Sequence, residues 1–405
     1  MPGFVSAQNN TNSPYTRYGY GNLSDNATAT QRGMGGIGYG LRNSQLINTM
    51  NPASYSNIDS MTFMFDMGLT GRYAWFQEGL NKEKKINGGV EYLAMQFPLA
   101  KKLGMGIGIE PVSTVGYAYG ETDYLPIDSG LVSYIFQGSG GLSRVYTALS
   151  YNFFDKLSLG VKLSYLYGNI MHNNLVSFNS SNNYNTNWND TLRTYGLTYD
   201  LGVQYTFPVG KYKTIVLGGI YSPKIPIGGK VTNAIIRSDP STGLQMSKEY
   251  YATTDSVFEL PETYGLGFTY RKLDKVTAGL DILYQRWAEA KFYDQTNAFY
   301  DRLKINAGGE YIPNYASNNY LSRVRYRAGL NYTNSYLKVK DAGYKEYGLS
   351  VGLGLPMSDR RSFVNLAVEY SLIRPDVSTL IKEQYFKLTV SYTFNERWFV
   401  KRKVQ

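Results

Sequence analysis

The chain of 405 residues contains no cysteine and one histidine, and its formal net charge is +10. These counts exclude disulfides, cysteine nucleophiles and zinc sites built from several histidines. No apolar run reaches the roughly 18 residues that a helical membrane span needs, so that class of membrane protein is excluded as well.

The first residues resemble the end of a secretory signal. Val5, Ser6 and Ala7 fit the small-residue pattern of a cleavage site, and Gln8 would begin the mature chain. We therefore expect residues 1–7 to be a signal-peptide remnant.

Residues 8–60 are rich in Asn, Ser, Thr and Gly and show no sustained periodicity. Their glycine-rich stretch, residues 32–40, is not preceded by a predicted strand and lacks the Lys-Ser/Thr of a phosphate-binding loop. Glycines at this density allow backbone to pack closely in a narrow space. We expect residues 8–60 to form an N-terminal plug, or hatch, inside the lumen of a barrel.

From residue 61 onward, alternating segments recur at the spacing of a barrel. The predicted strands are 61–75, 86–97, 104–121, 139–153, 157–175, 191–207, 213–225, 255–271, 275–291, 300–312, 320–338, 342–356, 361–373 and 383–395. The connections after even-numbered strands are short, whereas longer loops are expected at 122–138, 176–190 and 226–254. This asymmetry is typical of outer-membrane barrels, which have short periplasmic turns and long outer loops.

The alternation is clearest near the C-terminus. Phe386, Leu388, Val390 and Tyr392 would share one uncharged face of a strand, and Lys387 would lie on the opposite face. A charged face fits a polar lumen, and an apolar face fits lipid. The predicted fold class is all-β: a 14-stranded antiparallel transmembrane β-barrel over residues 61–395, with the N-terminal lumenal plug before it and a basic periplasmic tail, residues 396–405, after it.

Four motifs resemble those of the FadL-type outer-membrane transporters of long-chain fatty acids and hydrophobic compounds. In chain order they are Arg32-Gly33-Met34-Gly35-Gly36 with Asn51-Pro52-Ala53-Ser54, then Gly104 to Pro111, then Leu260 to Gly267, and last Gly279-Leu280-Asp281 through Trp287. The resemblance implies a hatch motif at Arg32, Gly33, Gly35, Gly36, Asn51, Pro52 and Ala53. It also implies a kink in the third strand at Gly108, Glu110 and Pro111, which would open a lateral path from the barrel into the membrane.

A stripe of arginines is the sharpest charged feature of the predicted strands. Arg323, Arg325 and Arg327 alternate with apolar residues, so all three would point into the lumen. One interpretation is a ladder that guides anions, or a latch that holds the plug through Asp25 or Asp59. The other is a structural network with Glu310 and Glu369.

Nothing in the chain indicates an enzyme, because the single histidine, His172, has no nucleophile elbow beside it. We expect no cofactor and no metal, and the dispersed positive charge argues against a nucleic-acid partner. The leading hypothesis is passive uptake of hydrophobic or amphipathic small molecules across the outer membrane of a Gram-negative cell. The alternative is a structural or docking subunit of a complex for protein export or barrel assembly. Expected partners are outer-membrane lipid and lipopolysaccharide, with a hydrophobic ligand or envelope proteins according to the hypothesis.

Overall fold

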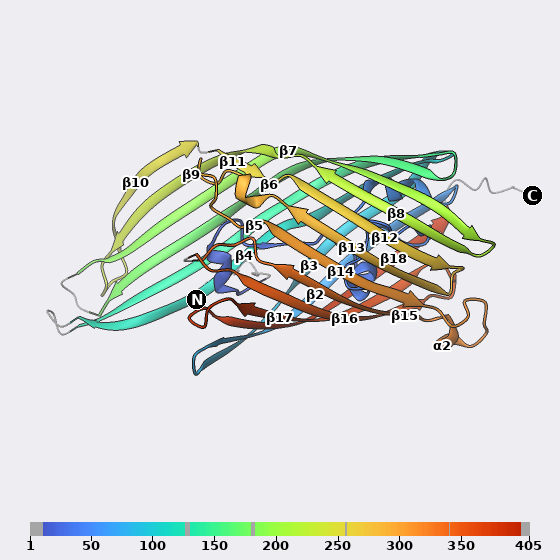
Figure 1. Ribbon diagram of the computed structural model, residues 1–405. Helices are drawn as coiled ribbons and strands as arrows, with labels where there is room; N and C mark the ends of the chain where they lie inside the picture. The colour runs from blue at the N-terminus through green and yellow to red at the C-terminus, as the bar shows by residue number, and fades with distance from the viewer. Residues whose placement is uncertain (1–10, 126–129, 180–182, 256, 340, 398–405) are drawn as a thin grey trace, which may run out of the picture.

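Fourteen of the described strands form one closed antiparallel barrel (Figure 1). The computed structural model describes residues 11–125, 130–179, 183–255, 257–339 and 341–397. The wall strands are β2 (Thr62–Glu78), β3 (Asn81–Ala100), β4 (Leu103–Leu125), β5 (Gly130–Phe153), β6 (Leu157–Phe178), β7 (Asn185–Gly210), β8 (Lys213–Ser222), β12 (Thr263–Lys272), β13 (Val276–Gln285), β14 (Arg302–Tyr311), β15 (Arg325–Asn334), β16 (Tyr344–Pro356), β17 (Phe363–Pro375) and β18 (Lys382–Arg397). Pairing of β18 with β2 closes the barrel. The predicted 14-stranded fold is confirmed.

Two further strands lie in the region predicted to be the long loop 226–254, so that prediction is wrong, and a third follows within the predicted strand 255–271. They are β9 (Ile225–Ser238), β10 (Gln245–Asp255) and β11 (Phe258–Leu260). β9 pairs with the outer half of β7, from Asn185 to Tyr195, and β10 and β11 pair with β9. These strands extend the sheet beyond the wall instead of adding to its strand count.

The loop predicted at 122–138 is also mostly strand. β4 runs to Leu125 and β5 begins at Gly130. Gly140 and Gly141 adopt positive φ values of 110° and 141°, a conformation that favours glycine. The β5–β6 ladder continues through these glycines, because β5 stays paired with β6 from Val132 to Phe153.

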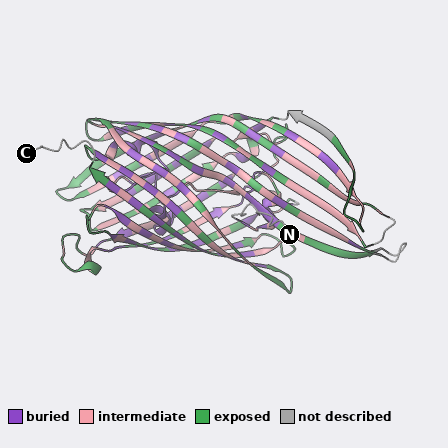
Figure 2. Ribbon diagram, turned by 180° about the vertical axis from the view of Figure 1, so that it is seen from behind, coloured by how far each residue is buried: buried purple, intermediate pink, exposed green. Residues whose placement is uncertain are grey.

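Buried and more exposed residues alternate along the wall strands (Figure 2), and in β18 this alternation separates a lipid-facing set of side chains from a lumen-facing set. Phe386, Leu388 and Tyr392 are exposed on the outside, whereas Lys387 and Thr389 are buried inside. Apolar side chains on the outer face are favourable only where acyl chains solvate them. Among the described residues, no helix is long and apolar enough to cross a membrane.

One end of the barrel carries the start of β2, the end of β18 and almost all of the shortest connections. The connections at this end are 101–102, 154–156, 211–212, 273–275, 312–324 and 357–362. Short turns and both ends of the wall place this end in the periplasm. Residues 312–324 are the exception in length, and they contain α2 (Tyr320–Arg323).

The segment before β2 lies inside the barrel (Figure 1). Residues 11–58, which we call the N-terminal segment, contain η1 (Pro14–Arg17), β1 (Asn22–Leu23), α1 (Ala29–Gly33) and η2 (Pro52–Asn57). On the outer side, η3 (Trp287–Glu289) follows β13. The expected signal remnant, residues 1–7, lies outside the described residues, as does residue 398 onward of the expected tail.

A charge on the outer face of the wall tests the membrane placement. Leu69 is half exposed near the middle of β2, opposite Val390 of β18. We expect Leu69→Arg to lower the free energy of unfolding by about 2–4 kcal/mol, because the charge would sit near the bilayer midplane. Urea unfolding in phospholipid vesicles, followed by tryptophan fluorescence, measures this change. Leu80→Arg, at a 98% exposed hairpin tip, is the matched control and should have no effect.

Candidate functional site

The N-terminal segment is fitted closely to the inner wall around α1. The side chain of Gln31 accepts a hydrogen bond from the Thr28 backbone at 2.8 Å, which caps the first turn. After the helix, Gly35 has a φ of 69°, and its N–H donates to the Ser350 hydroxyl at 2.9 Å. A Cβ atom on Gly35 would lie 2.6 Å from the Ala307 carbonyl oxygen. Only glycine therefore fits at position 35, because the backbone has a positive φ and the wall leaves no room for a side chain.

The Asn-Pro-Ala motif anchors the end of the segment. The Asn51 side chain accepts from the Ala53 N–H at 3.0 Å and donates to the Tyr39 carbonyl at 2.8 Å. Pro52 occupies the start of η2, where a missing N–H costs nothing. The Ala53 carbonyl accepts from the Ser150 hydroxyl of β5 at 2.7 Å. The motif thus terminates the segment against the wall.

Arg32 joins the segment to two wall strands through carboxylates, and a lysine of a third strand shares one of these acids. Its guanidinium lies 2.5 Å from Glu91 of β3 and 3.5 Å from Glu369 of β17. Lys387 of β18 reaches Glu91 at 2.8 Å. All four side chains are at least four-fifths buried, so losing one partner would leave an uncompensated charge in a poorly solvated space.

Asp25 makes a second ionic contact with the opposite wall. Its carboxylate lies 2.5 Å from the Lys304 ammonium and 3.4 Å from the Arg302 guanidinium, both on β14. Burial opposes ionisation, but the two cations outweigh it and hold the pKa of Asp25 well below its ordinary value. Asp25 is therefore charged at neutral pH and ties the segment to β14. Asp59, the other latch residue considered from sequence, is exposed at the periplasmic end.

Two of the three predicted arginines share one acid, and the third is elsewhere. Arg327 and Arg325 lie 2.7 and 3.6 Å from Glu310. Arg323 does not face the lumen with them, because β15 begins at Arg325 and Arg323 ends α2, with its guanidinium over the Tyr320 ring. Glu369 contacts Arg32 instead of this group. The side chain of Gln45, in the N-terminal segment, accepts a hydrogen bond from Arg325. Among the described residues, neither Asp25 nor Asp59 forms an ion pair with these arginines.

Glu110, at the predicted kink, belongs to a buried cluster of four charges. Its carboxylate lies 2.6 Å from Arg144 and 3.2 Å from Lys162, and Asp200 lies 3.3 Å from Arg144. Lys162 also donates to the Thr49 carbonyl of the N-terminal segment at 3.2 Å. The cluster fixes β4, β5, β6 and β7 around the end of the segment.

The wall opens beside this cluster, between β3 and β4. The two strands pair from Ala100–Leu103 to Leu93–Ile109, and no β3–β4 pair beyond Ile109 occurs among the described residues. β3 continues along β2, and β4 continues along β5 with a register shift between Pro111 and Ser113. Gly108 lies just before the separation, where a Cβ atom would be 2.6 Å from the Leu93 carbonyl oxygen. A cavity of about 420 Å³ occupies the separation.

The N-terminal segment occupies part of the edge of β4 that β3 leaves. β1 pairs with β4 through Asn22–Thr114 and Leu23–Ser113, and the Ser24 N–H donates to the Val112 carbonyl at 2.9 Å. Further along, the Thr16 hydroxyl accepts from the Gly116 N–H at 3.1 Å. Backbone polar groups facing a membrane need partners, and the segment supplies them here.

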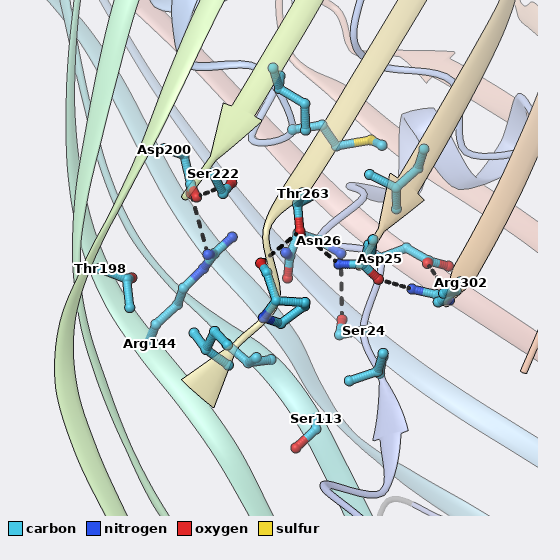
Figure 3. A pocket seen from close by; sticks show the side chains of 18 of the residues that line it. Ser24, Asp25, Asn26, Ser113, Arg144, Thr198, Asp200, Ser222, Thr263 and Arg302 are labelled. Atoms are coloured by element: carbon cyan, nitrogen blue, oxygen red, sulfur yellow. Dashed lines mark hydrogen bonds and ion pairs between the residues drawn. The ribbon is translucent and has the colours of Figure 1, made fainter. Parts of the chain in front are cut away.

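Two internal cavities of about 160 Å³ each flank β1. One shares Val90, Glu91, Pro111 and Thr114 with the opening, and the other shares Ser113. In the latter cavity Arg144 reaches Asp200, which also accepts from Ser222, and Asp25 lies beside Arg302 (Figure 3). The opening therefore shares lining residues with both internal cavities.

Several attachments escaped sequence reasoning. Asp281 accepts from the Gly38 and Tyr39 N–H groups at 2.6 and 2.8 Å, although it was noted only as part of a strand motif. Arg144 was not singled out. The sequence does show that Asp281 and Arg144 are charged residues at lumen-facing positions of alternating strands. It does not show which residues they contact.

These features define an outer-membrane β-barrel whose lumen holds its own N-terminal segment. A sequence model of one family, BamG, matches residues 2–405. The chain therefore belongs to the BamG family. A comparison with curated proteins found no match.

Solved structures share the fold at low identity. The Pseudomonas putida toluene transporter TodX is 15% identical, with a TM-score of 0.62 over 95% of this chain and 99% of that one. A Pseudomonas aeruginosa FadL homologue is 12% identical, with a TM-score of 0.61 over 92% and 99%. The Ralstonia pickettii toluene transporter TbuX is 14% identical, with a TM-score of 0.59 over 93% and 99%. The FadL-type fold inferred from the motifs is confirmed.

Removing the charge of Asp25 tests its contact with β14. We expect Asp25→Asn to loosen the N-terminal segment, because Lys304 and Arg302 would lose their carboxylate at a cost of about 3 kcal/mol. Planar bilayers should record more frequent and larger conductance steps than the native chain gives. Asp59→Asn, at an exposed position, is the control. Equal conductance for the two variants would show that Asp25 does not hold the segment.

Proposed function

We propose that this barrel passes hydrophobic or amphipathic small molecules across the outer membrane, by a passive route through the opening between β3 and β4. The observation that carries the proposal is the end of the β3–β4 ladder at Leu93–Ile109, with a cavity at that point which shares lining residues with the interior. An apolar molecule could then leave the barrel sideways into lipid.

The lining of the internal cavities supports a ligand with both apolar and polar parts. The cavity drawn in Figure 3 is lined by Leu142, Leu260 and Trp287 as well as by Arg144 and Arg302. The rest of the lumen is lined by charges that disfavour a free acyl chain. A lateral exit shortens the path of such a molecule through that polar space.

A covalent bridge across the opening tests the route. Val90 of β3 and Thr114 of β4 both line the opening and the adjacent internal cavity. The chain has no cysteine, so Val90→Cys with Thr114→Cys can be bridged selectively by a flexible bismaleimide. We expect the bridge to slow uptake of labelled oleate and of toluene into proteoliposomes by about tenfold or more, which corresponds to about 1.4 kcal/mol on the barrier.

The matched control bridges the same strands where they are paired. Met95 and Ile107 face each other in the ladder, so Met95→Cys with Ile107→Cys stiffens the wall without spanning the opening. Its uptake should equal that of the native chain. If the bridged Val90–Thr114 variant transported both compounds at the native rate, the lateral route would be rejected.

A second candidate function, a docking subunit of an envelope complex, is favoured by how firmly the segment is held. Arg32, Asp25 and the Glu110 cluster connect it to wall strands on opposite sides of the lumen. A barrel closed in this way is a rigid platform. Stable co-purification in stoichiometric amounts after mild detergent extraction, together with native uptake by the bridged variant, would favour this function.

A further inference from the structure

The connection between β14 and β15 differs from its neighbours at the periplasmic end. Residues 312–324 form an ordered projection that contains α2 (Figure 1), whereas the adjacent connections, 273–275 and 357–362, are short turns. Ile312 and Val324 are buried and anchor its two ends, and the Ile312 N–H donates to the Lys275 carbonyl at 2.8 Å. The projection is held in place by the wall.

The projection exposes large apolar side chains on the water side of the interface. Tyr315 and Leu321 are 64% and 65% exposed. The strands on either side carry exposed Tyr311 and Tyr326, which fit the aromatic belt where a barrel meets the headgroups. The chain between these tyrosines therefore lies beyond the belt. Apolar side chains exposed to water on a preformed loop are typical of a protein contact.

The charge around the projection is strongly positive. Basic residues on it, on the two adjacent turns and at the end of β12 are Arg271, Lys272, Lys275, Arg323, Arg360 and Arg361, against the acids Asp274 and Asp359. Asp274 is paired with Arg271, and Asp359 accepts from the Arg361 and Ser362 N–H groups at 3.0 Å each. Among the described residues, the other five basic side chains have no ion pair. An acidic surface would complement them, and it would also steer the encounter.

We propose that residues 312–324 and the adjacent turns form a docking surface for an acidic periplasmic protein. Tyr315 and Leu321 would enter an apolar groove of the partner, and the surrounding basic side chains would pair with its rim. The inference deepens the second candidate function by giving the face and the chemistry of the partner. The inference does not depend on passage of molecules through the opening. The paired part of β3 and β4 separates the opening from the periplasmic end.

Photocrosslinking in living cells tests the surface with the full chain. A benzoylphenylalanine at position 315 or 321 should give one discrete adduct, which mass spectrometry identifies as a protein with an excess of Asp and Glu on its surface. Phe154, 85% exposed in the β5–β6 turn, is the control position on the same end and should not give that adduct. Heat-modifiable migration on gels confirms that each variant is a folded barrel.

Charge reversal then separates docking from chance proximity. Lys275→Glu with Arg360→Glu and Arg361→Glu should reduce the adduct at least tenfold, whereas Lys101→Glu with Lys211→Glu, in other periplasmic turns, should leave it unchanged. Purified partner should bind the native chain more weakly as salt rises. Adducts with phospholipid only, equal adducts from position 154, or an adduct unaffected by the triple reversal would each overturn the proposal. Oleate uptake by the triple variant is expected to be native, so the transport proposal is judged separately.

Discussion

Every backbone polar group in the membrane needs a hydrogen-bond partner, and this requirement governs both the wall and the N-terminal segment. A closed barrel meets this need by pairing each wall strand with two neighbours, and β18 with β2 completes the circle. After Ile109, however, β4 is no longer hydrogen-bonded to β3 in the part of the chain that the structure describes. The N-terminal segment restores part of the missing hydrogen bonding, because β1 and Thr16 bond to the freed edge of β4. Wall and segment are therefore one hydrogen-bonded system.

Buried charge is the second constraint on the lumen. In each main cluster one carboxylate is shared by two cations: Glu91 by Arg32 and Lys387, Asp25 by Lys304 and Arg302, and Glu110 by Arg144 and Lys162. A shared acid connects elements that are distant in the chain, and removing Asp25 would leave Lys304 and Arg302 without an ion pair among the described residues. The positions of the N-terminal segment are set by these acids and by close backbone approaches at glycines such as Gly35.

The outer half and the periplasmic end of the barrel differ in structure, and each of the two proposals rests on the features of one of them. The outer half contains the separated strands, the internal cavities and the added β9–β11 sheet, which together suit a route for small molecules. The periplasmic end has short turns, a basic surface and one ordered projection, which suit a protein contact. A single BamG-family barrel can carry both surfaces because they occupy separate parts of the wall.

The sequence by itself determined the barrel, because lipid and lumen impose a period of two that remains visible in β18 and in most wall strands. The hatch glycines and the kink at Pro111 stay predictions from the sequence. The folded chain was needed to show that 122–138 and 226–254 are mostly strand, since these stretches are held as strands by their partners: β4 pairs with β5, and β9 pairs with both β7 and β10. The tertiary structure also decided that Arg323 leaves the arginine stripe, and that Asp25 contacts Lys304 instead of Arg325 or Arg327. Alternation tells which face a side chain takes, whereas its partner depends on register and on the path of the N-terminal segment, and these are set by contacts between residues far apart in the chain.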